Sequence, residues 1–219
     1  MAALDQNATT DYTSDQESIA DCVSIVQASQ TNVVKCVLVL NGKGNKVYFI
    51  SGPHGGGKTT LIKQLSNLIV VKIVYEGYEE IRYIVLTVEG NKEREVKINE
   101  HLMSRNLEAE EDIVLVDRAP NVDTLAYYMA YEVMDKYNGR ILPSNLDDFF
   151  NELLTKEEKE SLREHLRSSN TIFLIPYDHC YDVIRKRVLD RKRDWDAPCD
   201  DKTYKALCMS YDYIISLNE

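Results

Sequence analysis

The stretch GPHGGGKTT (52–60) limits the fold of this 219-residue chain more than any other feature of its sequence. It directly follows the apolar run KVYFIS (46–51). The pattern G-x-x-x-x-G-K-[ST] is met by Gly52, Gly57, Lys58 and Thr59. Glycines let backbone N–H groups turn inward around an anion, and the helix that follows directs its positive end at the same point. The stretch therefore predicts a strand, a phosphate-binding loop and a helix, in that order.

The side chains around this loop have separate expected roles. Lys58 would reach the outer phosphates of a nucleotide, and the Thr59 hydroxyl would bind Mg²⁺. A second magnesium partner is expected at the end of a neighbouring apolar strand, where IVLVDR supplies Asp117. We therefore expect ATP and Mg²⁺ as ligands. The full set of residues expected to hold the nucleotide in this region is Gly52, Gly55, Gly56, Gly57, Lys58, Thr59 and Thr60.

Strands and helices alternate along the chain from residue 46. Strands are predicted at 46–51, 69–75, 112–117 and 171–176, and helices at about 58–67, 91–106, up to 137, 154–169, 179–192 and from 201. The strands IVLV and IFLI are apolar throughout, which is expected when helices cover both faces of a sheet. This order predicts a three-layer α/β fold with a mostly parallel central sheet.

Residues 1–45 are predicted to be a short N-terminal extension to a domain that spans 46–219. A capping box at Ser14–Glu17 would start a helix, after residues without regular structure. The run VVKCVLVL (33–40) predicts a strand, and NGKGN (41–45) predicts a tight turn into the next strand.

Composition narrows the class of partner. The formal net charge of −10 argues against duplex nucleic acid or an anionic membrane as the main partner. The five cysteines are scattered and never spaced as C-x-x-C, which favours reduced thiols in the cytoplasm. The acidic, polar N-terminus does not have the pattern of a secretory signal, and no apolar run approaches the ~20 residues of a membrane-spanning helix. We expect a soluble protein.

The phosphoryl group of a bound nucleotide could be transferred to water, to a small acceptor or to a macromolecule. A switch GTPase would need an N-K-x-D element late in the chain, and both N-K pairs precede the Asp117 strand without the required Asp. The run RVLDRKRDWD supplies three arginines, of which Arg187 and Arg191 share a helix face and Arg193 follows. Phosphoryl transfer needs positive charge that closes over the transferring group. A basic lid at about 187–200 is therefore predicted.

Over residues 46–215 the sequence resembles the P-loop nucleoside and nucleotide kinases, with thymidylate kinase nearest. The stretch DRAPNVDTLAY (117–127) is similar to the family element D-R-Y-x-x-S-x-x-A-Y, although it is one residue longer, so that Asp123 or Thr124 would replace the serine. The lid motif R-[IV]-x-x-R-x-R is met by Arg187, Val188, Arg191 and Arg193. Tyr204 and Tyr211 resemble the aromatic residues of the closing helix, and YEGYEEIR (75–82) resembles an acidic segment that would bring Glu76 near the acceptor.

This resemblance implies a P-loop NTPase fold and transfer of the γ-phosphoryl group of ATP to a small nucleoside or nucleoside monophosphate. It implies that Arg118 binds the phosphate or sugar of the acceptor and that Tyr127 lies against its base, with plain core packing as the other interpretation of Tyr127. Arg187 would contact ATP, and Arg191 or Arg193 would neutralise charge in the transition state. The residues expected to act in catalysis are Lys58, Glu76, Asp117, Arg118, Arg191 and Arg193.

Two alternatives stay open at this point. The chain could be an ATP-binding regulatory or assembly protein without acceptor turnover, which its N-terminal extension and acidic composition would suit. It could also phosphorylate nucleic-acid ends or modified bases, gripping a strand with the basic run Arg185–Arg193, although the net charge disfavours this. A homodimer is left open, and no membrane partner is expected.

Overall fold

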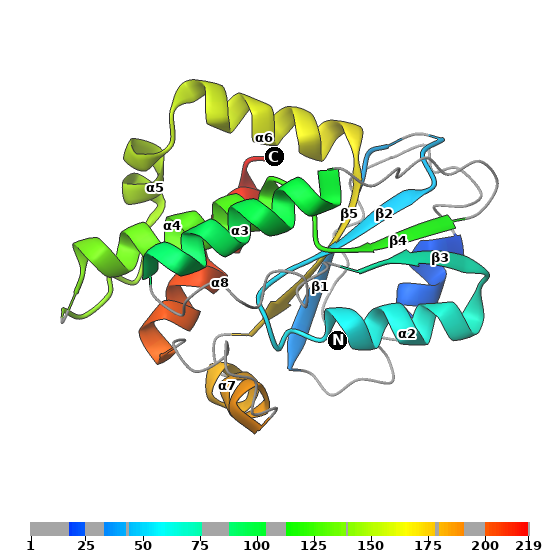
Figure 1. The fold of residues 1–219 in the computed structure, drawn as a ribbon, viewed down its shortest axis with the longest axis horizontal. Helices are drawn as coiled ribbons and strands as arrows, with labels where there is room; N and C mark the ends of the chain where they lie inside the picture. Colours follow the sequence, from blue (N-terminus) through cyan, green and yellow to red (C-terminus); the bar gives the residue numbers. More distant parts are fainter. Residues whose placement is uncertain are drawn as a thin grey trace.

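The computed structural model describes residues 18–24, 33–42, 44–75, 88–103, 113–138, 140–177, 180–190 and 200–218 (Figure 1). The capping box at Ser14–Glu17, the acidic residue Glu76 and the lid arginines Arg191 and Arg193 lie outside these ranges. Among the helices in the described part of the chain, none is long and apolar enough to cross a membrane.

A five-stranded sheet forms the middle layer. Its strands are β1 (Val34–Leu40), β2 (Val47–Ser51), β3 (Val71–Val74), β4 (Ile113–Asp117) and β5 (Asn170–Pro176), and their order is β1-β5-β2-β4-β3. The last four strands in sequence run parallel, and β1 alone of the five pairs antiparallel, with β5. The mostly parallel sheet predicted from the sequence is confirmed, and each predicted strand matches within two residues.

Helices cover both faces of this sheet, as its apolar strands predict (Figure 1). Helix α2 (Lys58–Leu68) and the helical residues 18–24 lie on one face. The other face is covered by α3 (Val88–Met103), α4 (Val122–Lys136), α5 (Asp147–Leu153), α6 (Lys156–Ser168) and α8 (Asp201–Ser216). The helix α7 (Tyr181–Asp190) follows β5 and packs against α8.

Side chains of each strand alternate between the two faces. On β2, Tyr48 and Ile50 pack with Leu61 and Ile62 of α2, whereas Phe49 belongs to the larger core on the opposite face. Both cores exclude water, so β2 is buried along its whole length. The phosphate loop therefore starts from the centre of the sheet, where its backbone is fixed on both sides.

The N-terminal strand is arranged differently from what a tight turn would suggest. The turn at 41–45 does lead from β1 into β2, but β5 lies between these two strands. β2 already pairs with β4 on one edge and β5 on the other, so β1 cannot pair with β2 and instead pairs with the outer edge of β5. β1 thus belongs to the same sheet although it precedes residue 45. Ile19 and Val23 from the first helical segment are buried in the core between the sheet and α2.

Candidate active site

The phosphate loop joins β2 to α2 through glycines in backbone conformations that other residues rarely adopt. Gly52, Gly55 and Gly57 have φ values of 133°, 81° and 97°. A Cβ on Gly52 would lie 2.3 Å from the Leu174 carbonyl oxygen of β5. At this position a side chain is excluded by both conformation and space.

The N-terminus of α2 has space in front of its first turn. Its N-cap, Gly57, has no side chain that could cap the first turn, and a Cβ at this position would meet no atom within 4 Å. The first backbone N–H groups of a helix lack intrahelical partners and attract anions. The loop backbone thus fits a phosphate group, and Thr60 lies exposed on the first turn of α2.

Lys58 and Thr59 lie at the start of α2 and face the loop and the next strand. The Lys58 ammonium donates to the carbonyl oxygens of Gly52 at 2.5 Å and Pro53 at 3.2 Å, so it lies across the loop. The Thr59 hydroxyl donates to the Asp117 carboxylate at 3.2 Å. The β2–β4 register, which pairs Ile50 with Asp117, brings this carboxylate beside the loop. A hydroxyl and a carboxylate are oxygen ligands of the kind that Mg²⁺ prefers, so this pair fits the metal.

Arg118 follows Asp117 in a strained turn between β4 and α4. Its φ of 103° is unusual for a residue with a side chain, and such strain persists only where surrounding contacts hold it. The guanidinium pairs with both carboxylate oxygens of Glu95 on α3, at 2.8 and 3.3 Å, and only 4% of Arg118 is exposed. Arg118 is therefore held inside the protein, and its predicted contact with an acceptor stays a prediction.

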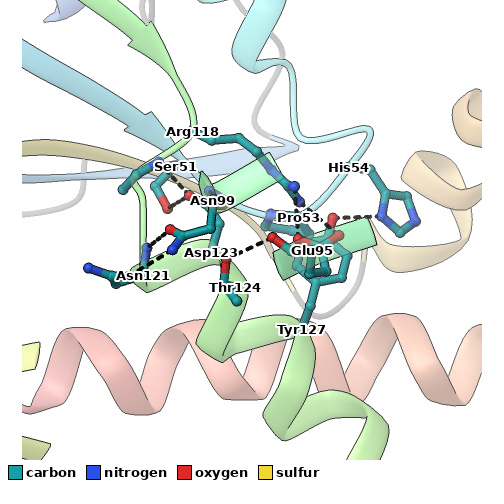
Figure 2. A network of polar contacts seen from close by, with 12 residues as sticks. Ser51, Pro53, His54, Glu95, Asn99, Arg118, Asn121, Asp123, Thr124 and Tyr127 are labelled. Atoms are coloured by element: carbon teal, nitrogen blue, oxygen red, sulfur yellow. Dashed lines mark hydrogen bonds and ion pairs between the residues drawn. The ribbon is translucent and has the colours of Figure 1, made fainter. Parts of the chain in front are cut away.

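Tyr127 connects this arginine to the phosphate loop (Figure 2). The Arg118 guanidinium lies 4.9 Å from the centre of the Tyr127 ring, within the range of a cation–π contact. The Tyr127 hydroxyl and His54 Nδ1 are 2.9 Å apart, and burial raises the pKa of Tyr127 well above its usual 10. Tyr127 thus keeps its proton at neutral pH. Its ring is buried, as core packing predicts, and its contact with an acceptor base stays a prediction.

His54 is a functional candidate that sequence reasoning missed. The sequence gives it no specific role because it occupies a variable position of the loop pattern. In the structure, its backbone oxygen accepts a hydrogen bond from the Tyr204 hydroxyl of α8 at 3.0 Å, and its ring contacts both Tyr127 and Tyr204. The loop is thereby attached to α4 and α8.

Helix α3 supplies a second group of residues that the sequence did not single out. Asn121 donates its backbone N–H to Asn99 at 2.6 Å, and Asn99 donates back to the Asn121 side chain at 3.1 Å. The Thr124 hydroxyl donates to the Glu95 carbonyl oxygen at 3.3 Å. Helical spacing was the available signal, since Glu95 lies three residues before Ile98, which is buried in the core.

Helix α7 packs directly on the phosphate loop. A Cβ on Gly55 would lie 2.5 Å from Val188 and 3.0 Å from Ile184, so only a glycine lets the loop approach this helix. Arg187, one residue before Val188, is exposed. The described residues of the predicted site thus lie at the ends of β2 and β4, at the start of α2, on α4 and on α7, whereas Glu76, Arg191 and Arg193 lie outside the described residues.

Comparison with protein families matches residues 47–215 to the AAA domain. The chain belongs to the AAA domain family. This AAA domain is accordingly a P-loop nucleotide-binding domain, as the glycine geometry and the Lys58 and Thr59 positions indicate. The match gives no specific support to thymidylate kinase, and no curated protein and no solved structure matches the chain.

Proposed function

We propose that this AAA domain is an ATP-dependent phosphotransferase that moves the γ-phosphoryl group to a nucleoside or nucleoside monophosphate. The observation that carries the proposal is the contact between α7 and Gly55 of the phosphate loop. α7 bears Arg187, and Arg191 and Arg193 follow it in the sequence within a few residues. Basic side chains attached to such a helix can reach a transferring phosphoryl group and neutralise its charge.

Each group of the site has a role in this reaction. The loop N–H groups and Lys58 bind the triphosphate, and Thr59 and Asp117 would hold Mg²⁺. When bound, Mg²⁺ would supply positive charge that offsets the charge of the phosphates. The bond between the γ-phosphorus and its bridging oxygen breaks as the acceptor oxygen bonds to that phosphorus, and ADP leaves. Arg191 or Arg193 stabilises the charge that spreads over the transferring group.

The polar cluster beside the loop supports an acceptor other than water. Glu95, Arg118 and Tyr127 provide a carboxylate, a guanidinium and a phenol from two helices and a turn. A few convergent polar groups of different kinds are typical of sites that orient a small molecule. On the other side of β2, β5 ends in the apolar residues Leu174, Ile175 and Pro176, which cannot orient a water by side-chain hydrogen bonds.

Variants of the Glu95–Arg118 pair can distinguish a nucleoside acceptor from a nucleoside monophosphate acceptor. A hydroxyl acceptor must lose its proton, so a carboxylate near it would act as a base. A monophosphate has a second pKa of about 6 and is already anionic at neutral pH, so it would need Arg118 more than Glu95. In Glu95→Gln, a nucleoside kinase would lose kcat about a hundredfold or more. A monophosphate kinase would keep kcat and show a changed KM for the acceptor. The same variant of Glu76 tests the carboxylate implied by the family resemblance.

The experiment that tests the proposal combines ATP titration calorimetry with an ADP-release assay against a panel of nucleosides and nucleoside monophosphates. We expect ATP to bind and ADP release to depend on one class of acceptor, and Lys58→Ala to abolish the release. ATP binding without acceptor-dependent ADP release would reject the kinase and favour an ATP-binding regulatory protein. ADP release that requires an oligonucleotide and falls with salt would favour a kinase of nucleic-acid ends.

A further inference from the structure

A single buried carboxylate connects the phosphate loop with the turn that carries Asp117 and Arg118. Asp123, on the first turn of α4, is only 2% exposed. One of its oxygens accepts hydrogen bonds from the Ser51 hydroxyl at 3.0 Å and from the Ala119 backbone N–H at 2.6 Å. The other accepts from the Tyr211 hydroxyl at 2.5 Å and from the Gly52 N–H at 3.5 Å. Figure 2 shows Asp123 and Ser51 directed toward each other.

All four partners of Asp123 are donors, which explains why this position suits a carboxylate. An ionised carboxylate only accepts hydrogen bonds, whereas an amide would direct two donor hydrogens at one of these pairs. The Tyr211 hydroxyl remains protonated and able to donate, because burial and then the nearby Asp123 charge raise its pKa well above the usual 10. Hydrogen bonds to an ionised carboxylate are charge-assisted, and the contacts from Ala119 and Tyr211 are the shortest of the four.

These donors belong to parts of the chain that are far apart in sequence. Ser51 and Gly52 end β2 and begin the loop, 72 and 71 residues before Asp123. Ala119 lies next to Arg118, the residue with the strained φ of 103°. Tyr211 lies on α8, 88 residues after Asp123. A buried charge is a poor stabiliser compared with an apolar side chain, so the contribution of Asp123 lies in the geometry it imposes.

We propose that Asp123 is a positioning residue that fixes the start of the phosphate loop relative to the Asp117–Arg118 turn. It acts through Ser51, Gly52 and Ala119 and touches neither ATP nor acceptor. By fixing these two segments, Asp123 keeps Thr59 at the end of the loop close to Asp117 at the start of the turn. The two side chains then stay close enough to share one Mg²⁺. The role in transfer rests on the proposed function, whereas the alignment of Thr59 with Asp117 also applies to a domain that only binds ATP.

The test compares the dissociation constant of ATP with Mg²⁺ and with a chelator, in the wild-type chain and in Asp123→Asn. Because Thr59 and Asp117 bind the metal, Mg²⁺ should tighten wild-type binding, and Asp123→Asn should lose most of this gain, about tenfold. Asp135→Asn, an exposed carboxylate on the same helix, is the matched control and should behave as wild type. Melting curves show how much of each variant is folded.

A structural role alone would lower the melting temperature of Asp123→Asn and leave the Mg²⁺ gain of the folded fraction unchanged, which would overturn the inference. So would a wild-type chain whose ATP affinity does not respond to Mg²⁺. If Asp123→Asn does not fold, Ser51→Ala decides, because it removes one donor and leaves the carboxylate paired; an unchanged Mg²⁺ gain there contradicts the inference. Failure of every acceptor in the ADP-release assay would reject the kinase while leaving this binding test intact.

Discussion

The phosphate loop and the β4–α4 turn lie side by side but are built in opposite ways. The loop is made of consecutive residues, and its shape depends on three glycines at positive φ, which distant residues support but do not specify. The turn contains Arg118 and Asn121 at positive φ, neither of them glycine, and it is held by side chains from α3 and from α4. The comparison teaches that a run of consecutive residues is enough to recognise the loop, whereas the shape of the turn on the proposed acceptor side is recognised only from its tertiary contacts.

The largest effect is expected at Gly52, where neighbouring atoms leave no room for a side chain. Gly52→Ala would place a Cβ 2.3 Å from the Leu174 carbonyl oxygen at a φ of 133°, so we expect ATP binding to be lost and the free energy of unfolding to fall by more than about 3 kcal/mol. Titration calorimetry and urea denaturation measure both. Gly44→Ala, at a φ of 71° with no atom within 4 Å, should cost only about 1–2 kcal/mol and keep ATP binding. Equal effects of the two substitutions would contradict this view of the loop.

The next largest effect concerns the basic residues after α7. Arg191→Ala should lower kcat about a thousandfold, because comparable arginines contribute 10³–10⁵ to phosphoryl transfer. Steady-state kinetics with the identified acceptor measure it. Lys186→Ala removes an equal charge from an exposed position on α7 and should leave kcat within about threefold. If both variants lose activity equally, the effect is one of overall charge.

A smaller effect tests how strongly tertiary contacts shape the loop. Tyr204→Phe removes the hydrogen bond to the His54 carbonyl oxygen, and we expect a loss of about 1 kcal/mol in stability and a several-fold weaker ATP affinity. Tyr213→Phe removes a similar hydrogen bond, to Asn151, from the same helix. Its stability should fall by a similar amount with unchanged ATP affinity. The idea that α8 supports the loop fails if the two variants have the same ATP affinity.

The smallest effect is a pH dependence of stability that comes from a histidine outside the loop. Burial lowers the pKa of His165 below its usual 6.5, and the Asp123 charge opposes this only in part. The unfolded chain therefore binds more protons than the folded one just below pH 6.5, so through this residue stability falls as the pH drops from neutral through that range. His165→Gln should lose less stability than wild type over the same range, as measured by denaturation at several pH values. An identical decline in both proteins would mean that His165 does not contribute.

Much of the fold could be predicted because its signals are local. The glycine pattern predicted β2, the loop and α2, and the fully apolar strands predicted a sheet covered on both faces. The packing of Tyr48 and Phe49 into cores on opposite sides of β2 confirms this. The position of β1 in the sheet could not be predicted from such local signals. Its sequence predicts a strand but does not show that both edges of β2 are already occupied.

The contacts of Arg118 in the candidate site could not be predicted from local signals either. The sequence singled out Arg118 and Tyr127 through the family resemblance, but Glu95 lies on a polar helix with other acidic residues and no motif. Only the packing of α3 against α4 brings it within 2.8 Å of the guanidinium. The spacing of Glu95 and the buried Ile98 indicates only that Glu95 lies toward the core side of α3, and it does not identify Arg118 as the partner.

The most direct test of the central claim follows the γ-phosphorus of ATP by ³¹P NMR in the presence of the acceptor panel. We predict that its signal moves to a phosphorylated acceptor as ADP appears, and that Lys58→Ala prevents this transfer. Conversion of the γ-phosphorus to inorganic phosphate alone, at a rate that no acceptor changes, would contradict the account and leave a nucleotide hydrolase.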